Sequence, residues 1–116
     1  MMKYDEAMTA LLEVMRKDYA ESTLRSPYND KTPEEAYAET EEMFFVESGR
    51  SYDKIVKKSG NQRCCSGFVC RKDNPKKGFV TGDLLMSAGW NGPATNFARG
   101  NMLNGEFERV RWTGVL

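Results

Sequence analysis

The sequence GFVTGDLLMSAGWNGPATNFARGN (residues 78–101) combines apolar, turn-forming and polar residues more closely than any other part of the chain. Phe79–Thr81 is expected to be a strand. Gly89–Pro93 predicts a turn, because glycine adopts positive φ and proline suits the first turn of a helix. A short helix, Ala94–Arg99, is expected to follow and to end at Gly100-Asn101, since both residues tolerate the left-handed conformation.

The same segment carries candidate ligand-binding residues. Trp90 or Trp112 would stack on a base, Asn91 or Asn96 would read its edge, and arginines would hold phosphate. A structural interpretation stands beside this one, because asparagine and glycine also cap helices and turns, and tryptophan also packs in cores. The predicted ligand-binding residues are Trp90, Asn91, Asn96, Arg99, Asn101, Arg109 and Arg111.

Three short patterns in this region resemble small uncharacterised bacteriophage proteins. They are Gly82-Asp83-Leu84-Leu85, Ala88-x-Trp90-x-x-Pro93-Ala94 and Ala98-Arg99-Gly100-Asn101. The similarity covers residues 52–101. It implies a viral or prophage origin, and because it comes with no established activity, it transfers no functional residues.

Charge divides the chain into two parts. A chain of 116 residues predicts one domain, residues 1–116. Residues 1–49 hold 5 Lys/Arg and 12 Asp/Glu, a net charge of −7, whereas residues 50–116 hold 12 and 5, a net charge of +7. The basic part predicts an anionic partner. Alternatively, the two parts complement each other within one subunit or across a homodimer or higher homo-oligomer.

Histidine is absent and there are three cysteines, Cys64, Cys65 and Cys70. Without histidine no Ser-His or Cys-His pair can form. Asp83 is the single carboxylate near the polar cluster, so the sequence predicts no enzyme and no catalytic residues. The cysteine spacing fits no zinc site, and no metal or cofactor is expected.

The charged N-terminus and the absence of a long apolar run predict no signal peptide and no membrane-spanning segment. The protein is therefore expected to be cytoplasmic with reduced thiols (in the host cytoplasm if the protein is viral). On a strand, Cys64, Phe68 and Cys70 would share one face, with Cys65 and Val69 on the other.

The acidic part predicts two helices. Apolar residues recur at helical spacing from Tyr4 to about Thr23. The second helix is expected to begin after Thr32, with Pro33 at its first position and Glu35 completing a capping box. It is expected to continue through Met43 and Phe44 to Ser48-Gly49, as an acidic rod.

The basic part predicts a small antiparallel sheet. Strands are expected at Tyr52–Lys57, Arg63–Arg71 and Phe107–Trp112, in addition to Phe79–Thr81. Asp73–Gly78 is expected to be a hairpin-type loop. The predicted fold class is therefore α+β: two N-terminal helices followed by a small antiparallel sheet with one short inserted helix.

Two functions fit these observations. The first is a phage-type accessory protein that binds a nucleotide or single-stranded nucleic acid and sequesters a host defence signal, with Lys54 and Arg63 joining the arginines that hold phosphate. The second is a protein-interaction inhibitor of a host complex, an anti-defence or host-takeover factor that acts through the acidic helical part. The sequence favours the first, because the basic charge and the Trp, Asn and Arg residues lie in the same part.

Overall fold

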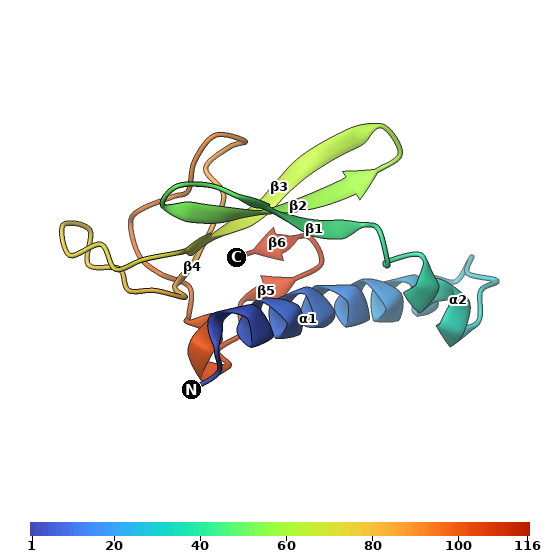
Figure 1. Cartoon of the computed structure of the whole chain (residues 1–116). Coiled ribbons are helices and arrows are strands. Elements are labelled where there is room, and N and C mark those ends of the chain that lie inside the picture. The colour runs from blue at the N-terminus through green and yellow to red at the C-terminus, as the bar shows by residue number, and fades with distance from the viewer.

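The computed structural model describes residues 1–116 and has an α+β fold, which confirms the predicted fold class. One long helix lies across one face of a four-stranded antiparallel sheet with the order β1-β2-β3-β4, and a small hairpin, β5-β6, lies between helix and sheet (Figure 1). None of the helices is both long and apolar enough to span a bilayer. The elements are α1 (Tyr4–Leu24), α2 (Pro33–Ala38), β1 (Phe44–Ser48), β2 (Tyr52–Ser59), β3 (Gln62–Cys70), β4 (Leu84–Leu85), the 3-10 turn η1 (Met102–Asn104), β5 (Val110–Arg111) and β6 (Gly114–Val115).

Helix α1 confirms the prediction from apolar periodicity. Ala7, Leu11 and Met15 recur every four residues, and all three are fully buried against the sheet. Asp5 and Glu6 lie in the first turn, where their charges favour the helix dipole. The helix thus buries one stripe and leaves its opposite side to solvent.

Helix α2 begins as predicted but ends early. The Thr32 hydroxyl accepts from the Glu35 backbone N–H, and the Glu35 side chain accepts from the Thr32 N–H, so the capping box is present. The helix stops at Ala38, and the expected continuation to Ser48 was wrong. Residues 40–43 form tight turns, and Phe44 then starts strand β1. The run Phe-Phe-Val favours a strand, and pairing with β2 outweighs the helical periodicity.

A bulge in β3 changes which cysteines share a face. Ile55 pairs with Gly67 and Val56 with Cys65, so Ser66 is an extra residue without a partner. Cys65 therefore packs with Phe68 and Cys70 on the face of the sheet away from α1, called the outer face below, whereas Cys64 does not. The expectation that Cys64 shares this face was wrong, because strict alternation assumes a regular strand.

The loop region after β3 also differs from prediction. Phe79–Thr81 is not a strand; Phe79 makes one bridge to Asn74. Ala94–Arg99 is not a helix, because the backbone at its end is hydrogen-bonded to β4. The Arg99 N–H donates to the Leu84 carbonyl at 2.7 Å, and the Leu84 N–H donates to the Gly100 carbonyl at 2.8 Å. The inserted helical turn is η1 instead. The predicted strand at the C-terminal end is reduced to β5.

Two apolar clusters occupy the two faces of the sheet. The larger lies between α1, the inner face and the β5-β6 hairpin, and includes Leu11, Phe44, Ile55 and Val115. The smaller lies on the outer face, under the loops that precede and follow β4; its buried residues are Phe68, Cys70, Phe79 and Leu85. The outer face and its loops hold the cavities described next.

Candidate functional site

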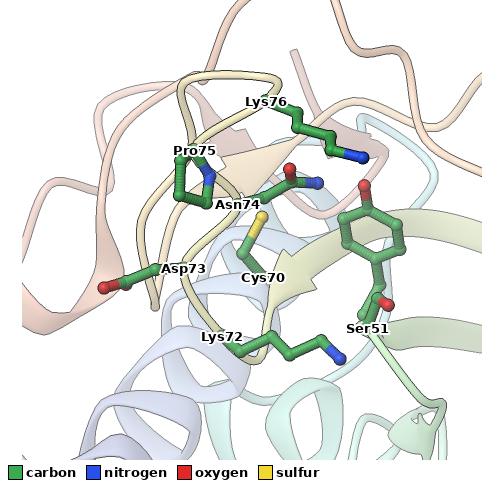
Figure 2. A pocket seen from close by; sticks show the side chains of 8 residues that line it. Ser51, Cys70, Lys72, Asp73, Asn74, Pro75 and Lys76 are labelled. Atoms are coloured by element: carbon green, nitrogen blue, oxygen red, sulfur yellow. The ribbon is translucent and has the colours of Figure 1, made fainter.

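A cavity of about 280 Å³ opens where β2 begins and β3 ends. The loop after β3 forms its far wall, and the Cys70 thiol points into its centre (Figure 2). The lining combines two amines, two hydroxyls, a carboxylate, an amide and a thiol around one aromatic ring. Its residues are Ser51, Tyr52, Cys70, Lys72, Asp73, Asn74, Pro75 and Lys76.

The loop that forms this wall is fixed by its own hydrogen bonds. Asn74 and Phe79 exchange backbone hydrogen bonds of 2.8 and 3.1 Å, which close the turn between them. The Asp73 carboxylate accepts from the Thr81 backbone N–H at 2.8 Å and from the Thr81 hydroxyl at 3.0 Å. These bonds lower the pKa of Asp73 and hold its side chain away from the cavity centre, as Figure 2 shows. The loop therefore presents its amines and its amide to the opening.

The cavity is positively charged. Neither Lys72 nor Lys76 has a carboxylate within 4.0 Å, and the one acidic lining residue, Asp73, is bound to Thr81. The Lys76 amine lies over the cavity on the same side as the Asn74 amide (Figure 2). Two free ammonium groups around a small polar space favour an anionic ligand.

A second cavity of about 270 Å³ adjoins the first, because Ser51 and Tyr52 line both. Lys54, Arg50 and Asn91 contribute polar groups to it. Its acidic residue, Glu47, forms an ion pair with Arg63 and is thereby neutralised. The full lining is Glu47, Ser48, Gly49, Arg50, Ser51, Tyr52, Lys54, Phe68 and Asn91.

Trp90 lies beside this second cavity. The residue is 39% exposed, and the Lys54 amine lies 3.9 Å from the ring centroid, with the Arg63 guanidinium at 5.7 Å. The turn around Trp90 is held by the bonds Ala88 N–H to Gly92 carbonyl, 3.1 Å, and Ala94 N–H to Met86 carbonyl, 2.8 Å. The structure thus brings the predicted Trp90 and Asn91 onto the outer sheet face beside the predicted Lys54.

The other predicted residues lie apart from the cavities. Asn96 and Arg99 are together, with the Arg99 Nη1 donating to Asn96 Oδ1 at 2.9 Å. Arg109 lies near the ring of Phe97. Arg111 donates to the backbone carbonyls of its own turn.

Asn101 is buried, and its side chain supports the local backbone. The amide Nδ2 donates to the Thr81 carbonyl and to Asp83, each at 3.0 Å, and Oδ1 accepts from the Leu103 N–H at 2.9 Å. The Asp83 carboxylate also accepts from the Val80 N–H at 2.9 Å. Both amide protons of Asn101 are therefore used within the protein.

Sequence reasoning did not single out Tyr52, Lys72, Asn74 or Lys76 as site residues. The signal was the basic, proline-containing loop Asp73–Gly78, interpreted only as a connection. A loop with two exposed lysines becomes a site only when the strand ends Ser51-Tyr52 and Cys70 are placed beside it. That proximity depends on the β2-β3 pairing of Tyr52 with Cys70.

The Cys70 thiol is held in its protonated form. Burial, and to a lesser extent the nearby charge of Asp83, raises the pKa of Cys70 from 9.0 to about 11. Cys64 is exposed, and Cys65 is half-buried with its Sγ 3.6 Å from the Gly67 carbonyl. Since the thiolate is the reactive form, Cys70 contributes packing and a weak hydrogen-bonding group rather than a nucleophile. No group of three or more Cys, Asp and Glu side chains is placed to hold a metal ion.

The raised pKa of Cys70 predicts a loss of stability in alkaline solution. Between pH 9 and 11 the unfolded chain releases the Cys70 proton while the folded chain keeps it, so the contribution is complete below pH 9 and is lost as pH rises to about 11. Between pH 9 and 11, the free energy of unfolding should therefore fall by about 1–2 kcal/mol less in a Cys70→Ala variant than in the wild type. Urea unfolding measures both values. The exposed Cys64→Ala variant is the control and should follow the wild type. Equal slopes for wild type and Cys70→Ala would contradict the assignment.

The whole chain, residues 1–116, matches the model of a family described as "Family of unknown function (DUF7717)". Searches of curated proteins and of solved structures found no match. The chain therefore belongs to the DUF7717 family.

Proposed function

We propose that this member of the DUF7717 family binds a phosphate-bearing ligand, a nucleotide or a short single strand of nucleic acid, in the two adjoining cavities at Ser51-Tyr52. The observation that supports this most directly is the continuity of the two cavities, which share these two residues. Each cavity alone lies near the lower limit for a small-molecule site, and the pair together reaches the usual range.

The charge of the lining favours phosphate. Lys72 and Lys76 in the first cavity, and Arg50 and Lys54 in the second, have no carboxylate within 4.0 Å. An ammonium group binds phosphate as a point charge, and a guanidinium binds it through paired N–H donors. A phosphate at Lys72 and Lys76 would also lie near the Asn74 amide.

The aromatic part of the ligand would lie along Tyr52. This side chain lines both cavities, is half-buried and packs edge-on against Phe68 with ring centroids 6.2 Å apart. Tyr52 supplies a fixed ring for stacking, which tolerates any base. Asn91 supplies an amide that can pair with a base edge. Trp90 would not contact the ligand with its ring face, because the Lys54 amine covers that face. It would instead hold the Lys54 amine in place.

A lysine pair in one loop provides a sharp test. Lys76 lines the cavity, whereas Lys77, its neighbour, is exposed and does not. We expect Lys76→Ala to weaken binding of a nucleoside triphosphate about tenfold or more, the loss of a charge-assisted contact of about 1.5–3 kcal/mol, and Lys77→Ala to change it less than about threefold. Isothermal titration at fixed salt, with mononucleotides and oligonucleotides, gives both values.

Equal effects of the two substitutions would mean a diffuse electrostatic surface, and the proposed site would be wrong. Binding of polymers alone, abolished by moderate salt, would have the same meaning. If no nucleotide class binds, the second predicted function is favoured. Its basis is the exposed acidic group Glu34, Glu35, Glu41 and Glu42 around α2, which suits a basic protein partner. The host signal, the host complex and the homodimer stay predictions.

A further inference from the structure

Arg99 is a buried arginine without an anionic partner. Only 7% of its surface is exposed, and no carboxylate lies within 4.0 Å of its guanidinium. Buried charges are normally paired, because leaving water is costly for an ion that has no counter-charge. The position therefore needs an explanation that the fold alone does not supply.

The hydrogen bonds of Arg99 are unevenly distributed over its guanidinium. Nη1 donates to Asn96 Oδ1 at 2.9 Å and to the Phe97 carbonyl at 2.7 Å, so this nitrogen is fully used. Nη2 has only the Met86 sulfur, a weak acceptor, at 3.9 Å. Nε is buried and has no partner. Nε and Nη2 form one edge of the guanidinium, the edge that binds two oxygen atoms of a carboxylate or phosphate side by side.

The surroundings add a second positive charge. Phe97, a residue that is 48% exposed, places its ring over the guanidinium of Arg99, with the ring centroid 3.9 Å from Cζ. Cζ of Arg109 lies 5.5 Å from the same ring, and Arg109 also has no carboxylate within 4.0 Å. Two guanidinium groups without carboxylate partners therefore lie against the same Phe97 ring. Their two positive charges match a doubly charged anion better than a singly charged carboxylate.

We propose that the Nε–Nη2 edge of Arg99, with Arg109, is a second phosphate-binding site, which takes a phosphate group when Phe97 moves aside. Two phosphate oxygens replace the weak Met86 sulfur contact, and Asn96 fixes the guanidinium from the opposite edge. The site is distinct from the cavities at Ser51-Tyr52 and does not rest on the function proposed for them.

Arginine side-chain NMR of the full chain tests this directly. The Nε–H signal of Arg99 is followed while inorganic phosphate is added, with sodium acetate at equal ionic strength as the control. We expect a saturable shift of this signal with phosphate and less than a tenth of that shift with acetate. A shift that does not saturate and is common to all arginine signals would overturn the proposal. An equal shift with acetate would overturn the assignment to phosphate.

Matched variants provide a second readout. Arg99→Met removes the buried charge, whereas Arg111→Met removes an exposed charge that bonds only to its own backbone. Phosphate should raise the melting temperature of wild type and Arg111→Met alike, and the rise should be clearly smaller in Arg99→Met; an equal rise in all three would overturn the proposal. Lys76→Ala should keep the Arg99 signal shift, which separates this site from the cavities. If Arg99→Met does not fold, Arg99→Lys takes its place: it keeps the charge but lacks the two-donor edge, and a full response in it would overturn the proposal.

Discussion

Replacing Phe44 with alanine is expected to lower the free energy of unfolding by about 3–5 kcal/mol, the usual cost of removing a buried phenylalanine. Phe44 is 2% exposed and lies in the main cluster between α1 and the sheet. Because small domains are stable by only about 5–15 kcal/mol, the variant should unfold at a much lower urea concentration. Equilibrium urea unfolding, followed by circular dichroism, gives the difference.

The neighbouring residue provides the control. Phe45 points to the opposite face of β1 and is only half-buried. Its ring centroid lies 5.2 Å from Cζ of Arg63. Phe45→Ala should cost about 1–2 kcal/mol, since less apolar surface is uncovered. A cost for Phe45→Ala equal to that of Phe44→Ala would mean that the segment does not alternate as a strand. This pair therefore tests the element that sequence reasoning assigned to a helix.

Gly114→Ala is the second substitution with a large expected effect, about 3–5 kcal/mol of lost stability. Gly114 is buried, has φ of 141°, and a Cβ at this position would lie 2.7 Å from the Ser66 backbone oxygen. The conformation alone costs roughly 1–3 kcal/mol in a residue with a side chain, and the close contact adds strain. The bulge residue Ser66 cannot retreat easily, because the strand on either side of it is paired. Thermal unfolding of the variant measures the loss.

Gly60→Ala separates backbone conformation from crowding. Gly60 has φ of 62° in the exposed β2-β3 turn, and a Cβ there would meet no atom within 4 Å. We expect a cost of only about 1 kcal/mol, from the left-handed conformation. If Gly60→Ala and Gly114→Ala are equally damaging, the contact with Ser66 is not what makes Gly114 necessary.

The N-terminal helix and the cap of the second were predictable because both depend on local residues. The stripe of Ala7, Leu11 and Met15 repeats at helical spacing, and Thr32 with Glu35 forms a motif that closes within one turn. The end of the second helix was not predictable in this way. Residues 44–46 can satisfy either period, and the choice of a strand is made by β2, a partner that a local pattern does not contain.

The same distinction applies to the candidate site. Trp90 and Asn91 could be selected from the turn chemistry of their own segment, and both lie at the second cavity or beside it. The expected helix at Ala94–Arg99 failed because the Leu84 backbone takes the hydrogen bonds of Arg99 and Gly100. The lysines of the first cavity were overlooked because a cavity wall is a property of spatial neighbours, and surface lysines alone carry no such information.

The position of the β5-β6 hairpin has a consequence for the order of folding. Val110 and Val115 belong to the same buried cluster as Ala7 and Leu11, and the Trp112 N–H donates to Asp18 at 2.9 Å across 94 residues. During synthesis the first helix is therefore made long before the residues that cover it. We expect slow, late folding, because closing such distant contacts limits the rate. Until then the exposed face of α1 is open to aggregation or to capture by a chaperone.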